Sequence, residues 1–189
     1  MMNARFGRQW MAIIILGTLL PPLSQAQDVR TVEHVEMSRY VGQWYEIARL
    51  PNRFQKDCVA NVTAQYTARP DGDLDVLNQC ERAGGKRHQA AGRARMVDPH
   101  SHAKLKIRFA PEWLSWLPFV WEDYWILALA DGYSYAAVGD PSRQYLWILS
   151  RAPTLPDDVY DTLLNRLTAQ GFDTASLVKT RQSQHQTTN

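Results

Sequence analysis

Short segments in which apolar and polar residues alternate constrain the fold of this chain more than any other feature. Between positions 59 and 69 small or apolar side chains recur at every second residue, and residues 74–80 alternate in the same way after the sequence Pro70-Asp71-Gly72-Asp73. A period of two places successive side chains on opposite faces of a strand, and a turn rich in Pro, Asp and Gly reverses its direction. The two segments therefore predict an antiparallel hairpin with one buried face.

The same arrangement recurs along most of the chain. The predicted strands, eight in all, cover residues 42–49, 59–69, 74–80, 87–97, 103–109, 123–130, 133–138 and 145–151. Short strands joined mainly by turns are typical of an antiparallel sandwich or barrel. After them, Pro156 opens a segment with apolar residues at helical spacing, which Gly171 ends. The sequence thus predicts an all-β domain with one amphipathic C-terminal helix packed on the outside of the sheet.

The two ends of the chain differ from this central part. Residues 1–26 combine Arg5 and Arg8 with an apolar run and end in Ser24-Gln25-Ala26, a pattern that predicts a secretory signal peptide cleaved after Ala26. The alternative is a membrane anchor, but the apolar run is shorter than the ~20 residues that span a bilayer. No Cys follows the run, so no lipobox cysteine is expected. Residues 27–178 are expected to form the domain and 179–189 a disordered polar tail.

Charge excludes one class of partner. Loss of the leader removes two Arg and no acidic residue, which leaves 19 basic residues against 19 acidic ones. Nucleic-acid binding depends on a basic surface that neutralises phosphates, so a nucleic-acid partner is not expected. The mature protein is expected in the periplasm or associated with the outer membrane, as a monomer or homodimer.

Two short motifs resemble a known family. Gly42-Gln43-Trp44 opens the first predicted strand, and the sequence from Trp44 to Arg49 is similar to that of bacterial lipocalins and apolipoprotein D. The run from Tyr145 to Arg151 resembles the third conserved region of lipocalins, whose Arg packs on that Trp. The resemblance implies an eight-stranded up-and-down barrel, or calyx, in which Gly42, Trp44 and Arg151 are structural residues.

Cys58 and Cys80 are the two cysteines of the chain. Thiols exported to an oxidising compartment tend to pair, so a disulfide is expected between them. The alternative is two independent buried thiols. If the strands alternate in direction, both cysteines lie at the end of the barrel opposite Trp44, where a disulfide fixes the mouth of the calyx.

A barrel of eight strands has an interior wide enough for one small ligand. The resemblance implies a fatty acid, a lysophospholipid or a related lipid, carried or stored in the cell envelope. The alternatives are a barrel filled by its own side chains, a membrane-peripheral structural lipocalin, and a lipid-modifying enzyme on the same scaffold. Strand parity nominates the following positions as ligand-binding: Val62, Tyr66, Val76, Tyr124, Ile126 and Trp147.

Little in the sequence favours an enzyme. The chain has no Gly-x-Ser-x-Gly elbow, no P-loop and no His-Glu-x-x-His motif. His100 and His102 lie in a Pro-containing turn with no third ligand nearby in the sequence, which favours a solvated loop over a metal site. No metal and no cofactor is expected, and a free thiol in the calyx would be the best candidate for a nucleophile.

Residues 111–121 form an apolar connection between the fifth and sixth predicted strands. Two prolines disfavour a regular element, and three Trp, two Leu, a Phe and a Val are expected to crowd the mouth of the calyx. Trp113, Trp116 and Phe119 are predicted to contact a membrane surface, where Trp is favoured. The alternative is a lid that folds over the calyx.

Overall fold

The computed structural model describes residues 28–183, and the predicted signal peptide lies outside these residues. The strands are β1 (Gly42–Arg49), β2 (Cys58–Ala68), β3 (Leu74–Arg82), β4 (Lys86–Met96), β5 (Lys104–Arg108), β6 (Glu122–Leu129), β7 (Tyr135–Gly139), β8 (Leu146–Ser150) and β9 (Val178–Lys179). The α-helices are α1 (Met37–Tyr40) and α2 (Asp157–Ala169), and the 3-10 helices are η1 (Ala83–Gly85), η2 (Glu112–Leu114), η3 (Pro118–Val120) and η4 (Thr174–Ser176). Within this part of the chain, no helix is long and apolar enough to cross a membrane.

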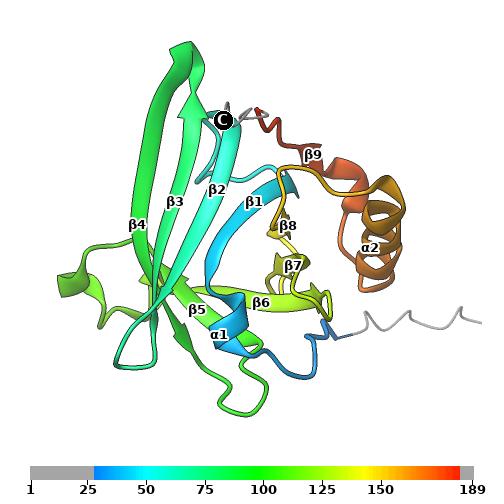
Figure 1. Cartoon of the computed structure of the whole chain (residues 1–189). Coiled ribbons are helices and arrows are strands. Elements are labelled where there is room, and N and C mark those ends of the chain that lie inside the picture. The colour runs from blue at the N-terminus through cyan, green and yellow to red at the C-terminus, as the bar shows by residue number, and fades with distance from the viewer. Residues whose placement is uncertain (1–27, 184–189) are drawn as a thin grey trace, which may run out of the picture.

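The strands form one antiparallel barrel (Figure 1). Each strand from β2 to β8 pairs with its neighbour in sequence, and β1 pairs with both β8 and β2, which closes the sheet. Trp44 faces Ala64 of β2 in this register, and Tyr45 faces Ser150 of β8. The predicted eight-stranded barrel with a helix on its outside is confirmed.

Two clusters of buried side chains hold the barrel and the helix together. One fills the lower part of the barrel and includes Trp44, Leu105 and Ile126. The other lies between α2 and the outer face of the sheet, where Leu163 and Leu167 are buried against strands β6 to β8. Figure 1 shows α2 beside β7 and β8, on the outside of the barrel. The single apolar stripe of the helix accounts for this position, because only a sheet surface offers it an apolar partner.

The segment before β1 closes one end of the barrel. The backbone N–H of Val32 donates to the carbonyl oxygen of Ile126, and that of Val35 donates to Ser101, while Val35 and Tyr40 are fully buried. Buried backbone groups need hydrogen-bond partners, and here β6 and the turn before β5 supply them. This end of the barrel is therefore closed.

Arg151 fixes the closed end to β1. Its guanidinium lies 3.8 Å from the centroid of the Trp44 ring, the pairing predicted from the sequence. It also donates hydrogen bonds of 2.7 to 3.0 Å to four backbone carbonyl oxygens, which belong to Arg39, Tyr40, Val41 and Gln43. Gly42 makes room for this contact: its φ is +101°, and a Cβ there would lie 3.2 Å from Arg151 Nη1.

The ordered domain extends beyond the predicted boundary at residue 178. Lys179 belongs to β9, which pairs with the end of β1, and the Thr180 N–H donates to Ile47. The Gln182 side chain donates to the carbonyl oxygens of Glu46 and Val62. The prediction of a disordered tail is wrong for residues 179–183, because a polar segment without periodicity can still be ordered by pairing with an open strand edge. Residues 184–189 lie outside the described part.

The barrel wall is uneven at β5. This strand has five residues, and it pairs with β4 only over Arg93–Met96, whereas β3 and β4 continue as a long hairpin (Figure 1). At the crossing, a Cβ on Gly92 would lie 2.5 Å from the carbonyl oxygen of Arg108, so the backbones approach too closely for any larger residue. The chain after Arg108 leaves the sheet and forms the mouth loop, residues 109–121.

Candidate functional site

A cavity of about 290 Å³ occupies the open half of the barrel. Its apolar lining comes from the strands and from the loops after β1 and β5: Phe54, Val62, Ala64, Tyr66, Ile107, Phe109, Ala110, Phe119, Val120, Tyr124, Tyr145, Trp147 and Leu149. Its polar lining is Glu46, Arg53, Gln55, Thr63, Asn78, Arg108, Glu122 and Asp123. Because both loops lie at the end of β1 opposite α1, the cavity opens away from the closed end.

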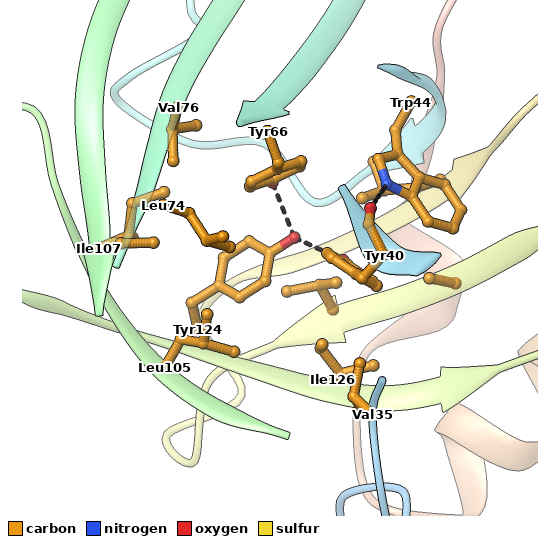
Figure 2. Close-up of a cluster of buried hydrophobic side chains, with 14 of the residues drawn as sticks. Val35, Tyr40, Trp44, Tyr66, Leu74, Val76, Leu105, Ile107, Tyr124 and Ile126 are labelled. Atoms are coloured by element: carbon orange, nitrogen blue, oxygen red, sulfur yellow. Dashed lines mark hydrogen bonds between the residues drawn. The ribbon is translucent and has the colours of Figure 1, made fainter. Parts of the chain in front are cut away.

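Three tyrosines meet in the buried cluster, and two of them, Tyr66 and Tyr124, also line the cavity (Figure 2). The hydroxyl of Tyr124 lies 2.8 Å from those of Tyr40 and Tyr66, and all three side chains are buried. Burial raises the pKa of Tyr66 to about 12 and raises the pKa values of Tyr40 and Tyr124 well above the usual value, so the three phenols are neutral at physiological pH. Two hydrogen bonds use only two of the three hydroxyl protons. The floor of the cavity therefore consists mainly of apolar ring surface, with hydroxyl groups at its centre.

A buried carboxylate lies in the wall. Glu46 is 3% exposed, and it accepts hydrogen bonds from Arg49 Nη1 at 2.8 Å, from Gln55 Nε2 at 2.6 Å and from the hydroxyl of Thr180. The side-chain oxygen Oε1 of Gln55 in turn accepts a hydrogen bond from Trp147 Nε1 at 2.8 Å. A buried charge is tolerated where an opposite charge and hydrogen bonds compensate for its lost hydration. The network thus fixes the Trp147 ring against the cavity.

The other acidic groups in the wall are also paired. Glu122 contacts Arg53 at 3.0 Å, and Asp123 contacts Lys106 at 2.9 Å. Arg108 is 4% exposed and bonds to the exposed carboxylate of Glu112 in the mouth loop. The wall therefore combines a large apolar area with a few compensated charges, which is the usual composition of a site for a small organic molecule.

The mouth loop exposes three large side chains. Trp113, Trp116 and Phe119 are 73%, 76% and 75% exposed, and the loop projects from the barrel between β5 and β6 (Figure 1). Trp121 differs from the expectation that it joins them at the surface. Its ring is 8% exposed and lies 4.1 Å from the Arg95 guanidinium, where a cation–π contact replaces exposure to water.

The disulfide between Cys58 and Cys80 is confirmed, with a Cα–Cα distance of 5.6 Å. It joins the start of β2 to the end of β3 at the open end. The chain consequently has no free thiol, and the best candidate for a nucleophile is absent. Among residues 28–183 no three His, Cys, Asp or Glu side chains are grouped so that they could hold a metal ion. His102 packs against His34 at 5.4 Å between ring centroids, in the turn at the closed end.

The residues nominated by strand parity divide into two groups. Val62, Tyr66, Tyr124 and Trp147 line the cavity. Val76 and Ile126 point into the barrel but belong to the packed core beneath it. Figure 2 shows both beside the tyrosine floor. Parity identifies the inner face of a strand, but it does not tell how far along the barrel axis the cavity extends.

Sequence reasoning missed the polar residues Glu46, Gln55 and Arg108. One signal was available, because Glu46 has the same strand parity as Trp44 and so faces inward despite its charge. No such signal existed for the other two: Gln55 lies in a loop, and Arg108 ends a strand where alternation stops.

Comparison with known proteins identifies the family. The family profile described as a lipocalin-like domain matches residues 35–182. Temperature-induced lipocalin-1 of Arabidopsis thaliana is 40% identical over 163 residues, covering 85% of this chain and 87% of that protein. Outer membrane lipoprotein Blc of Escherichia coli K12 is 37% identical over 171 residues, 90% of each chain. Apolipoprotein D of Macaca fascicularis is 34% identical over 157 residues, 79% of this chain and 78% of its own.

Solved structures show the same fold at lower identity. Insecticyanin of the tobacco hornworm Manduca sexta superposes with a TM-score of 0.64 at 21% identity, covering 85% of this chain and 87% of its own. The matched profile spans the barrel, α2 and β9, and the relatives cover nearly the whole of the described part. The sequence resemblance is thereby confirmed, and the chain belongs to the lipocalin family.

Proposed function

We propose that this lipocalin binds a small apolar or amphipathic lipid, such as a fatty acid or a lysophospholipid, and carries or stores it in the cell envelope. The observation that carries the proposal is the cavity of about 290 Å³ with its mainly apolar lining. Small-molecule sites usually measure ~300–1,000 Å³, so the space suits part of an acyl chain with the remainder at the mouth. A barrel filled by its own side chains would leave no such space.

An extracytoplasmic site of action is part of the proposal. The disulfide at the mouth supports it, because disulfides persist mainly in oxidising compartments. The leader pattern in residues 1–26 supports the same compartment, and two bacterial relatives are named as outer membrane lipoproteins. We infer a periplasmic or outer-membrane-associated protein.

Binding is proposed in preference to catalysis. An enzyme on this scaffold would need a nucleophile or a general base at the cavity, and both cysteines of the chain are engaged in the disulfide. The carboxylate of Glu46 is held by three hydrogen bonds in the wall, which suits a fixed structural group.

Filling the cavity is expected to weaken lipid binding strongly. Ala64 lines the cavity, and Ala64→Trp places an indole in the space that the acyl chain would occupy. The affinity for dodecanoate, measured by isothermal titration calorimetry, should fall by about tenfold or more, equal to a loss of ~1.4 kcal/mol or more. Ala68→Trp is the matched control, since Ala68 lies on the same strand but is exposed outside the cavity. Equal affinities for the two variants would contradict binding in the barrel.

A second proposed role is contact between the mouth loop and a membrane. Trp113 and Trp116 are largely exposed and do not line the cavity, which is not the arrangement of a lid folded inward, while Phe119 is exposed and also lines the cavity. Trp is favoured at bilayer interfaces, and exposed apolar side chains at a ligand entrance mark an interaction surface. We infer that the loop enters the interface so that a lipid can pass between the bilayer and the cavity.

Replacement of Trp113 and Trp116 by Ser should weaken binding to phosphatidylglycerol-containing vesicles by about tenfold or more, because the apolar area that enters the interface is lost. The transfer of a fluorescent fatty acid from the vesicles should slow in parallel. Affinity for soluble dodecanoate should change little. Unchanged vesicle binding together with a collapse of dodecanoate affinity would show instead that the loop is a lid.

A further inference from the structure

Three buried hydroxyl groups in the barrel carry one more proton than their hydrogen bonds use. The hydroxyl of Tyr124 lies 2.8 Å from that of Tyr40 and 2.8 Å from that of Tyr66, and within residues 28–183 these hydroxyls make no other hydrogen bond. Each neutral phenol has one proton to donate, and each bond uses one. One buried O–H group therefore has no acceptor in this part of the chain, which is costly unless a bound molecule supplies one.

The proton that remains free can face the cavity. Dashed lines in Figure 2 join the Tyr124 hydroxyl to the other two, and either of those can donate to it or accept from it. The free proton lies on Tyr40 only if Tyr66 donates to Tyr124 and Tyr124 donates to Tyr40. In the other arrangements Tyr66 or Tyr124 carries it, and both of these line the cavity, whereas Tyr40 does not. An acceptor in the cavity would select these arrangements.

Asn78 adds a second unpaired polar group beside the tyrosines. It lines the cavity, and its Oδ1 has no hydrogen-bond partner within residues 28–183. Tyr66 faces Val76 across β2 and β3, so Asn78, two residues further along β3, is its diagonal neighbour on the inner face, typically ~7–8 Å away. The last side-chain torsion of Asn is soft, so the amide can turn toward a ligand at little cost. A donor and an acceptor thus lie in neighbouring positions.

A charged group does not suit this position. Of the described residues that line the cavity, the cations are Arg53 and Arg108. The side chain of each is already paired with a carboxylate, that of Glu122 or that of Glu112. A carboxylate among the tyrosines would be buried without a cation of its own, which is costly. A hydroxyl group is neutral and has both an acceptor oxygen and a proton to donate, so it matches the two unpaired groups.

We propose that Tyr66, Tyr124 and Asn78 bind a hydroxyl group at the buried end of the ligand. This inference rests on the proposed lipid binding and specifies it: the protein selects acyl chains that carry a hydroxyl group at the end remote from the head. The hydroxyl oxygen accepts from Tyr66 or Tyr124, and its proton is donated to Asn78 Oδ1. The head of the lipid then lies at the mouth of the cavity.

The test compares ω-hydroxydodecanoate with tridecanoate, which has a methyl group in place of the hydroxyl, by isothermal titration calorimetry. In a purely apolar cavity the hydroxy acid would bind about tenfold more weakly, because its hydroxyl would be buried unpaired. The wild-type protein is expected instead to bind it about tenfold more tightly than tridecanoate, which leaves the polar groups of the protein unpaired. Equal or tighter binding of tridecanoate by the wild type would overturn the inference.

Two sets of variants locate the effect. Tyr66→Phe combined with Tyr124→Phe keeps the rings and removes both hydroxyls of the lining, so this variant should prefer tridecanoate. Tyr40→Phe is the matched control: it removes the hydroxyl that does not line the cavity and leaves Tyr66 and Tyr124 with one bond and one free proton, so the preference for the hydroxy acid should persist. Asn78→Leu removes the second group and should lower the ratio of the two affinities by about threefold or more.

The outcomes separate this inference from the proposed function. If the double variant does not fold, the wild-type comparison and Asn78→Leu decide the matter. A preference for the hydroxy acid that survives loss of both lining hydroxyls would overturn their role and leave lipid binding intact. If neither acid binds to the wild-type protein, the lipid-binding proposal itself fails.

Discussion

Replacement of Glu46 by Ala is expected to lower the free energy of unfolding by about 3–5 kcal/mol, which is typical when one partner of a buried ion pair is removed. The substitution leaves the Arg49 side chain, which is 12% exposed, without its carboxylate. It also leaves the Gln55 amide and the Thr180 hydroxyl without their acceptor, so the loop after β1 and the segment after β9 lose a common attachment. Urea unfolding followed by circular dichroism measures the change.

A double variant separates the cost of the unpaired charge on Arg49 from the cost of the lost hydrogen bonds. Glu46→Leu combined with Arg49→Met removes both charges and keeps apolar volume, and such replacements are often close to neutral. The double variant should therefore be more stable than Glu46→Ala by at least ~2 kcal/mol. If the two variants are equally unstable, the cost arises from the lost hydrogen bonds of Gln55 and Thr180 and not from the charge on Arg49.

Arg151→Ala is the second substitution with a large expected effect. It removes the cation over Trp44 and the donors to four carbonyl oxygens at the closed end, and we expect a loss of about 3 kcal/mol. For a domain of this size the melting temperature should fall by roughly 10 °C. Arg151 does not line the cavity, so dodecanoate affinity measured well below the melting temperature should stay nearly constant.

Arg151→Lys tests how the stabilisation is divided between the cation–π contact with Trp44 and the hydrogen bonds to the four carbonyl oxygens. A lysine keeps the charge near the indole, but its compact ammonium group cannot reach all four carbonyls at once. We expect a melting temperature between those of the wild type and Arg151→Ala. A large loss of ligand affinity at unchanged melting temperature, for either variant, would contradict a structural role for this residue.

The strands and the helix could be predicted because their signals are local, and the family resemblance supplied the barrel. Alternation in residues 59–69, the Asp71-Gly72 turn and the apolar spacing from Tyr160 to Leu167 each specify an element without reference to the rest of the chain. Arg151 and Trp44 could be paired because strand direction alone brings them to one end. The disulfide could be predicted from the expected oxidising compartment and from the strand directions, which place Cys58 and Cys80 at the same end of the barrel. These features depend on the order of the strands and the helix along the chain, which can be read directly from the sequence.

The site could be predicted only in part, because the extent of the cavity along the barrel axis and the conformation of the loops depend on tertiary contacts. Parity placed Val76 and Tyr66 on the inner face alike, yet only Tyr66 reaches the cavity. The ordering of residues 179–183 depends on the free edge of β1, which no local pattern in the tail reveals. Likewise, Trp121 is buried because two arginines from other strands, Arg95 of β4 and Arg108 of β5, pack against its ring.

The most direct measurement is the lipid content of the protein itself. The protein, purified without detergent, would be extracted with organic solvent and the extract quantified by mass spectrometry beside that of Ala64→Trp. A lipid-binding barrel predicts close to one equivalent of a lipid from the wild type and a strongly reduced amount from the variant. The same lipid in the same amount from both proteins would contradict binding in the cavity, and so would a wild-type protein that is empty and takes up no added dodecanoate.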